Sequence, residues 1–298
     1  MMNSSELPVK TKTRGSARRA LLAAAAVLSI ALPQSAAAGG VIKIAFDADN
    51  FDTPLDIDNP FLPMEENTTQ IYKAEGVDGC EVNVVTVTDD TKPITIPGNA
   101  TIQVRVVEDL AYEDTECDGA DDNELVEKTF DWFGQDNAGN VWYFGEDTFN
   151  CDPNPSPPPA VICTLGDGSW EAGQDVADVG HIAEPGIIML ADPDNGDQYH
   201  QEFYEGFAED QAKVTGISVK VILEREDAIS LEDDANCIKT KEWSPLDPGH
   251  VEQKYYCEDI GLVAVDEHHG KELRFELVTG AAASSSDAFD FRTVPGTR

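Results

Sequence analysis

Two histidine–carboxylate pairs are the residues whose types and spacing best suit chemistry. One residue separates His200 from Glu202, and one separates His250 from Glu252. On a β-strand, positions i and i+2 point to the same face, so each pair would present an imidazole and a carboxylate together. These groups bind divalent cations such as calcium and zinc. The alternative is that both pairs are solvated on the surface of an acidic protein.

Two cysteines relate one of these pairs to a further carboxylate. Cys237 and Cys257 flank a strand–turn–strand pattern whose midpoint is Asp247. A disulfide across this hairpin would set Glu242 directly opposite Glu252. Like charges in that position destabilise a sheet unless they are exposed, share a proton or bind a cation. The metal site that the sequence predicts therefore consists of His200, Glu202, Glu242 and Glu252.

The same register places Lys254 and Thr240 on the face that carries the two glutamates. Lys254 would neutralise one carboxylate and leave the other to bind a cation or to hold a proton. Acid–base catalysis needs two such groups with separated pKa values, so a hydrolase or lyase that uses Glu242 and Glu252 is an alternative function. Among 57 acidic residues accidental pairs are common, so an enzyme ranks below a binding protein.

Residues 129–148, TFDWFGQDNAGNVWYFGEDT, combine aromatic side chains with carboxylates. The turn DNAGN predicts a hairpin whose second strand is apolar on both faces, which is typical of a central strand or a barrel wall. The acids Asp131, Asp136, Glu146 and Asp147 are expected in solvent at the strand ends. The alternative is an aromatic pocket, whose candidate residues are Trp132, Trp142, Tyr143, Trp170, Tyr204, Trp243 and Lys254.

Short segments rich in β-branched and aromatic residues recur along the chain and predict strands. Gly, Pro, Asn and Asp separate them, and helical periodicity is scarce; 205–214 is the best candidate for a short helix. We expect an all-β fold, a single antiparallel barrel or sandwich with at most one or two short helices. The expected strands include 81–88, 101–107, 140–146, 198–204, 218–224, 237–243, 251–257, 261–267 and 271–278.

Six cysteines without a CxxC spacing indicate disulfides rather than metal thiolates. Cys151 and Cys163 bracket a proline-rich turn in the same way as Cys237 and Cys257 bracket theirs, so we expect both pairs to cross hairpins. By elimination, the third disulfide joins Cys80 to Cys117.

The first 38 residues have the basic, apolar and small-residue order of a secretory signal. After it we expect an extended acidic lead-in over 39–60, an all-β domain over 61–280 and a flexible tail over 281–298. No later segment is apolar for 18 residues, so no membrane span is expected. This organisation predicts a periplasmic or extracellular protein.

The chain carries a net charge of −37, and removal of the signal makes it −41, because five basic residues and one acidic residue are lost. Such a charge repels nucleic acid and anionic membranes. It suits high salt, divalent cations or cationic partners. We expect a monomer that binds a small molecule or cations.

Several segments together resemble a family of secreted bacterial proteins with a DWxxQDxxGNVWYFGED core. No activity is known for this family, so the resemblance implies one secreted domain over roughly 58–265 and assigns no catalytic residue. The matching segments are DNPFLPMEENTTQIY, TFDWFGQDNAGNVWYFGEDT, GSWEAG, QEFYEGFAED, TKEWSPLDPG, VEQKYY and GLV. The sequence thus favours a secreted β-domain that binds a small ligand, cation or surface component. The alternatives are the carboxylate enzyme and a structural component of the cell surface or matrix.

Overall fold

The computed structural model describes residues 41–76, 79–114, 117, 124–154, 160–166, 168–233, 235–268 and 272–279. The expected signal (1–38) and tail (281–298) lie outside these residues. No helix in the described part of the chain is long and apolar enough to cross a membrane. The elements are η1 Ala48–Asn50, β1 Thr68–Gly76, β2 Gly79–Thr95, β3 Thr101–Asp114, β4 Glu124–Gln135, β5 Val141–Asn154, β6 Ala160–Leu165, β7 Trp170–Glu171, β8 Glu184–Met189, β9 Gln198–His200, β10 Glu202–Phe203, β11 Gln211–Val219, β12 Cys237–Trp243, β13 Val251–Cys257, β14 Gly261–His268 and β15 Glu272–Thr279.

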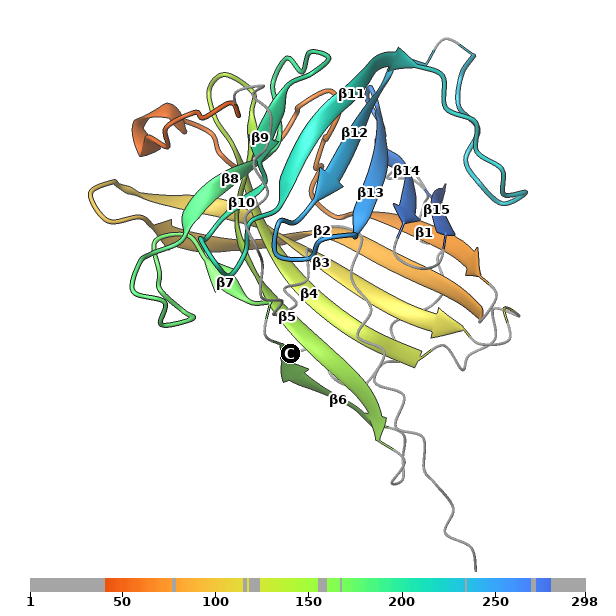
Figure 1. Cartoon of the computed structure of the whole chain (residues 1–298), viewed down its shortest axis with the longest axis horizontal. Coiled ribbons are helices and arrows are strands. Elements are labelled where there is room, and N and C mark those ends of the chain that lie inside the picture. The colour runs from red at the N-terminus through yellow and green to blue at the C-terminus, as the bar shows by residue number, and fades with distance from the viewer. Residues whose placement is uncertain are drawn as a thin grey trace, which may run out of the picture.

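The strands form one antiparallel sheet in the order β10-β8-β5-β4-β3-β2-β1-β15-β14-β13-β12-β11-β9, with β6 and β7 added on β5. Figure 1 shows β1–β5 curving beneath β11–β15, so that the two halves of the sheet face each other. The two ends meet where β8 contacts β9, a boundary that we call the seam, and no strand pairing crosses it within the described residues. The sheet is therefore a nearly closed barrel, which confirms the predicted fold class.

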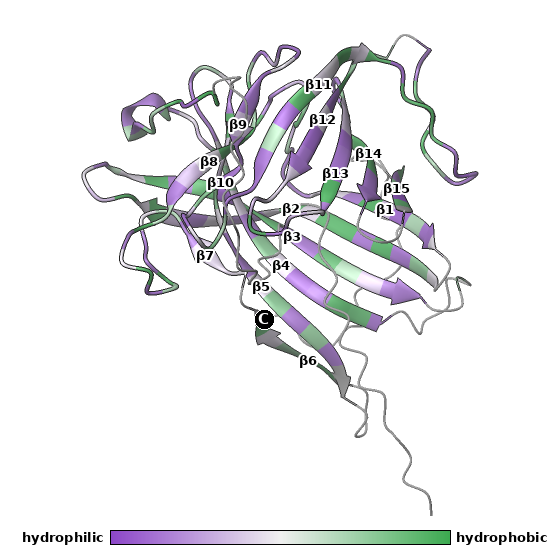
Figure 2. Cartoon of the chain, viewed as in Figure 1, coloured by the Kyte–Doolittle hydropathy of each residue, from purple (hydrophilic) through white to green (hydrophobic). Residues whose placement is uncertain are grey.

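Apolar side chains at alternate positions of the strands fill the interior of the barrel. In β15, Phe275 and Leu277 are buried in the core, whereas Arg274 and Glu276 point to the opposite face. Figure 2 shows bands of polar and apolar residues along β2 to β5, as this period of two requires. Because the sheet closes on itself, one face of each strand turns inward and its side chains meet those of strands far away in the sheet order.

All three predicted disulfides are present. Cys237 pairs directly with Cys257 across β12 and β13, and Cys151 pairs with Cys163 across β5 and β6. In both hairpins the Cα atoms of the two cysteines are 4.0 Å apart. The covalent links therefore fix the register of both hairpins.

A β-bulge interrupts the β4–β5 pair at Gly145. Asp131 pairs with Glu146 and Phe133 pairs with Tyr143, so Phe144 and Gly145 together oppose the one residue between Asp131 and Phe133. The bulge brings Tyr143 and Glu146, three positions apart, onto the same face of β5. Gly145 has φ 124°, and the carbonyl group of Trp170 lies where a Cβ atom would be.

Residues 41–60 pack against the outside of this hairpin. Ile42 forms a parallel bridge with Tyr199, and η1 follows the N-cap Asp47. The rings of Phe46 and Phe51 contact Trp142, with ring centroids 5.8 and 5.9 Å from it. The face of β5 that carries Trp142 is therefore core covered by this segment.

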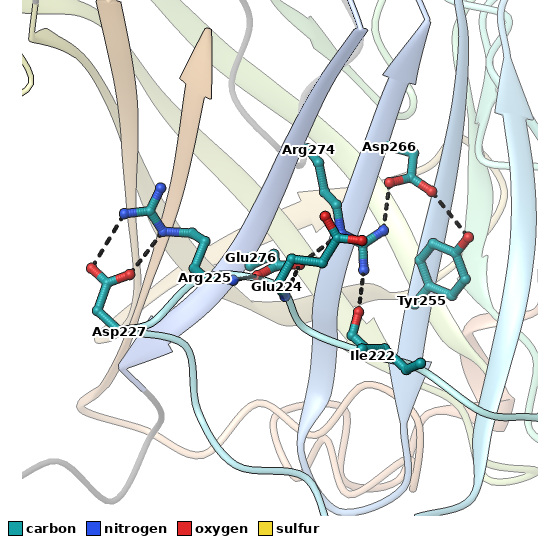
Figure 3. Close-up of polar contacts among 8 residues, drawn as sticks. All are labelled: Ile222, Glu224, Arg225, Asp227, Tyr255, Asp266, Arg274 and Glu276. Atoms are coloured by element: carbon teal, nitrogen blue, oxygen red, sulfur yellow. Dashed lines mark hydrogen bonds and ion pairs between the residues drawn. The ribbon is translucent and has the colours of Figure 1, made fainter.

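The expected strand at 218–224 ends at Val219, where the chain leaves the sheet. It then crosses the outer face of β13–β15, as Figure 3 shows. The buried Glu276 carboxylate accepts the backbone N–H groups of Glu224 and Arg225, each at 2.8 Å. Arg274 donates to Glu276 and to Asp266, both at 2.6 Å. Charges on the outer face thus hold this segment in place.

The helix expected at 205–214 is wrong. Tyr204 bridges Ala208 in a tight turn, and β11 begins at Gln211. Ala212 and Val214 are buried while Gln211 and Lys213 are half-buried, which is the period of a strand. Tertiary pairing with β12 therefore overrides the weak helical preference of this segment.

Gly145→Ala should lower the free energy of unfolding by about 3 kcal/mol or more, because the new methyl group meets the Trp170 carbonyl as well as an unfavourable φ. Gly98 also has positive φ (89°) but open space around its Cα. Gly98→Ala should therefore cost only about 1 kcal/mol. Urea unfolding of both variants measures the difference, and equal losses would contradict the close approach at the bulge.

Candidate functional site

Lys254 lies inside the barrel between two carboxylates. Its ammonium nitrogen is 3.0 Å from Glu242 Oε2 and 3.1 Å from Glu252 Oε2, and the side chain is 6% exposed. Glu242 pairs with Glu252 across β12 and β13, as the cysteine spacing predicts. Burial alone would lower the pKa of Lys254, but attraction to the two carboxylates outweighs burial and raises it well above its usual value. We call these three residues the lysine cluster.

Neutral donors complete the coordination of Glu242. Thr240 donates to Oε1 at 2.7 Å, Tyr256 donates to Oε1 at 3.2 Å, and Gln201 donates to Oε2 at 3.0 Å. Gln201 belongs to the connection between β9 and β10, so it reaches Glu242 from the seam. A charge-assisted network of this kind is stable in a buried position because its oxygens are satisfied.

A second set of carboxylates lies on β4, β5 and β10. Asp131 and Glu146 are both 0% exposed, and Glu202 is also buried. The Tyr143 hydroxyl lies 2.6 Å from Asp131 Oδ1 and 3.1 Å from Glu146 Oε2, and Trp170 Nε1 donates to Glu202 Oε1 at 3.2 Å. We call Asp131, Glu146 and Glu202 the acidic cluster.

Burial raises the pKa of all three carboxyl groups in the acidic cluster. A phenol has one proton to donate, so Tyr143 donates to one carboxylate and accepts from the other carboxyl group in its protonated form. Burial raises the pKa of Asp131 to about 7, and burial with repulsion from Asp131 raises the pKa of Glu146 well above its usual value. Burial and the neighbouring Asp210 raise the pKa of Glu202 in the same way.

The two clusters face a common interior. Asp131 on β4 and Lys254 on β13 lie on strands that are far apart in the sheet order, yet Lys254 lowers the pKa of Asp131 through its charge. Both side chains are buried, and their strands lie on opposite sides of the barrel in the sheet order. The lysine cluster has its own cation. Within the described residues, no ion pair joins a basic side chain to the acidic cluster.

Three buried oxygens on one face of β4–β5 have no hydrogen-bond partner among the described residues. They are Asp131 Oδ2, Glu146 Oε1 and Thr148 Oγ1. Asp131 is directly opposite Glu146, and Thr148 is the next residue of β5 on that face, opposite Thr129. A buried acceptor without a donor costs free energy, so such a group in a folded protein indicates strain or function.

The expected pairing of His200 with Glu202 is wrong. The chain bends at Gln201, where β9 pairs with β11 and β10 pairs with β8, so the two side chains separate. His200 is half-buried beside Phe203, with ring centroids 5.0 Å apart, and burial lowers its pKa.

Within the described residues, no group of three or more His, Cys, Asp or Glu side chains could hold a metal ion. His200, Glu202, Glu242 and Glu252 therefore do not form the expected calcium or zinc site. Lys254 supplies the positive charge between Glu242 and Glu252, and Glu202 belongs to the acidic cluster. His250 lies 3.7 Å from Glu252, at the outer side of the lysine cluster.

The candidate pocket residues divide into two groups. Tyr143, Trp170 and Lys254 belong to the interior clusters. The other four lie apart from the clusters. The ammonium nitrogen of Lys92 is 3.5 Å from the ring centroid of Trp132, and Trp243 is half-buried beside Lys241. Trp142 donates to Asp136 at 2.9 Å, and Tyr204 donates to Asp175 at 2.7 Å. The structure therefore places three of the seven expected pocket residues in the barrel interior, next to the two clusters.

Three of the four acids expected in solvent in the 129–148 segment are buried, and Asp147 is partly exposed. Asp131 and Glu146 are fully buried, and Asp136 is buried where it caps the turn and accepts from Trp142. Gln201 and Tyr256 were absent from the candidate set although both bind Glu242. For Asp131, a sequence signal was available: it lies two positions before Phe133 on the same strand, which places its carboxylate on an apolar face.

Lys254→Met should lower the free energy of unfolding by about 3–5 kcal/mol, because it leaves the buried Glu242 and the partly buried Glu252 without a compensating charge. Lys241→Met, on the exposed position of β12, should change it by less than about 0.5 kcal/mol. Chemical denaturation near pH 7 compares the two variants. Addition of Glu242→Gln to Lys254→Met should recover part of the loss, and similar stabilities for both lysine variants would contradict the lysine cluster.

Asp131→Asn should stabilise the protein above neutral pH. Since the folded pKa of Asp131 is raised to about 7, the unfolded chain releases this proton from about pH 4 upward while the folded protein retains it. Wild type therefore loses stability relative to the variant between pH 4 and 7, by up to about 4 kcal/mol. Melting temperatures of both proteins from pH 4 to 8 measure this, and a pH-independent difference would contradict it.

No protein-family model matches the chain, and no curated protein matches it. A solved structure that is similar is the crystal structure of "a putative lipoprotein from Parabacteroides distasonis". The match covers 74% of this chain and 97% of that chain, with 13% sequence identity and a TM-score of 0.33. At these values the match defines neither the detailed fold nor the activity of this protein.

Proposed function

We propose that the chain is an exported binding protein and that its ligand site is the acidic cluster inside the barrel. One observation carries the proposal: Asp131 Oδ2 and Glu146 Oε1 are fully buried acceptors to which no group in the described part of the chain donates. Folding does not supply their partner, so a bound molecule that donates hydrogen bonds would satisfy both. Ligand sites of this kind combine a few directed polar groups with apolar walls.

Aromatic rings provide those walls. Tyr143 stacks on Phe133 with ring centroids 4.9 Å apart, and Trp170 meets Tyr143 edge to face at 5.5 Å. All three rings are buried, and two of them carry the polar groups that bind the cluster. The aromatic surface and the carboxylates of the 129–148 segment therefore serve one interior site in this proposal.

Export is supported by the covalent framework. Three disulfides pair all six cysteines, which is compatible with an oxidising compartment outside the cytoplasm. The finer assignment, a protein secreted to the periplasm or the extracellular space through the signal at 1–38, is part of the proposal.

The segments that carry the family resemblance support an interior site. The core segment supplies Asp131, Tyr143 and Glu146, GSWEAG supplies Trp170, and QEFYEGFAED supplies Glu202. Segments that lie far apart in the sequence thus contribute to one cluster. A purely structural barrel would need no such convergence of buried acids.

Catalysis by Glu242 and Glu252 has less support. Both carboxylates bind Lys254, and Glu242 also accepts three neutral hydrogen bonds. Acid–base chemistry requires a carboxyl group that exchanges its proton with a substrate, and these two groups are committed to a cation within the protein.

Native mass spectrometry of protein purified gently from its own host tests the proposal. We expect wild type to retain a noncovalent ligand that the double variant Asp131→Asn, Glu146→Gln loses. Asp147→Asn removes a charge from the neighbouring position of β5 and should retain the ligand. Wild type at the mass of the protein alone, or equal retention in the double variant, would overturn the interior site.

A further inference from the structure

We propose that the acidic cluster binds a primary ammonium group, so that the ligand class is small amines. This inference rests on the proposed function, because it names the ligand of the same interior site. Three oxygen acceptors without donors lie on one face of β4–β5, at Asp131, Glu146 and Thr148. A primary ammonium has three N–H donors and one positive charge, which is the complement of this set.

The protein already contains this arrangement once. In the lysine cluster, the ammonium of Lys254 lies between two carboxylates that oppose each other across a strand pair, beside the Tyr256 hydroxyl. In the acidic cluster, Asp131 and Glu146 also oppose each other across a strand pair, and the Tyr143 hydroxyl contacts both. A ligand ammonium would occupy the second arrangement as Lys254 occupies the first.

The geometry favours an amine over a metal ion. Tyr143 already uses one oxygen of Asp131 and one oxygen of Glu146, so each carboxylate offers a single further oxygen. Within the described residues, no set of acidic and histidine side chains is arranged for metal coordination. The buried rings of Tyr143 and Trp170 lie beside the carboxylates and give an organic cation apolar contact surface, which a bare metal ion would not use.

Binding should exchange a proton for the ammonium ion. Burial raises the pKa of Asp131 to about 7, so this carboxyl group is partly protonated in the free protein at neutral pH. The bound amine keeps its three hydrogens, so the carboxyl proton leaves to solvent: R–NH₃⁺ plus carboxylic acid gives the ammonium–carboxylate pair plus H⁺. The charged and titratable groups that act on Asp131 and Glu146 are Glu127 on β4, Tyr143 on β5, Glu202 on β10 and Lys254 on β13. Amine affinity should therefore fall as the pH falls below 7.

The seam is where the barrel wall next to Glu202 lacks strand pairing among the described residues. Glu202 follows Gln201, where the chain passes from β9 on one side of the seam to β10 on the other. In the described residues no ladder of backbone hydrogen bonds joins β8 to β9, so separation there breaks fewer interactions than separation elsewhere in the sheet.

Isothermal titration calorimetry with n-butylammonium, tetramethylammonium and n-butanol tests the ligand class on the wild-type protein. We expect saturable binding of n-butylammonium at pH 7.5, at least tenfold weaker binding of the other two, and weaker binding of n-butylammonium at pH 5.5. Titrations in two buffers of different ionisation enthalpy should show proton release. Tetramethylammonium has no N–H donor, so equal affinity for it would overturn the inference.

Variants locate the binding and separate the two proposals. The double variant Asp131→Asn, Glu146→Gln should lose n-butylammonium binding by at least tenfold, whereas Asp147→Asn should bind as wild type does; circular dichroism checks that both fold. If wild type retains a native ligand but binds no n-butylammonium, the amine assignment fails and the interior binding site stands. If wild type retains no ligand and binds no amine, both proposals fail.

Discussion

The ion pairs of Lys254 set the charge balance of a barrel interior that contains several carboxylates. Lys254 is the only lysine buried within the described residues, and Glu242 and Glu252 both depend on its ammonium group. Glu242 is buried and Glu252 is partly buried, so the repulsion between these opposed carboxylates has to be met from inside the barrel. The position of Lys254 therefore limits where further buried negative charge is tolerated, and its attraction lowers the pKa of Asp131 by less than burial raises it.

The local half of this arrangement was predictable from the sequence. Equal spacing of Cys237 and Cys257 around Asp247 fixed one hairpin register, and that register placed Glu242 opposite Glu252 with Lys254 on the same face. Alternating strand patterns then indicated an all-β fold. These predictions succeeded because each depends on residues close in the chain, where strand period and turn position determine which side chains meet.

The rest depended on contacts that no local pattern encodes. The bulge at Gly145 places Tyr143 and Glu146 on one face although strict alternation would separate them. The bend at Gln201 separates His200 from Glu202 although strict alternation would join them. Both departures arise where the strand meets a second partner, β7 at the bulge and β8 at the bend. The sequence therefore identified the segments of the site, and tertiary pairing decided which side chains enter it.

Two of the disulfides stabilise the register of strands that carry interior carboxylates. A cross-strand pair of like charges favours a shift of register that would separate them, and a shift by one residue would turn a whole strand over. Cys237–Cys257 opposes such a shift in the hairpin that carries Glu242 and Glu252. Cys151–Cys163 lies on β5, the strand that carries Glu146, and anchors its far end to β6. Covalent links at the strand ends thus hold carboxylates in positions that electrostatics alone would not select, and Lys254 supplies a positive charge to one of the two sets.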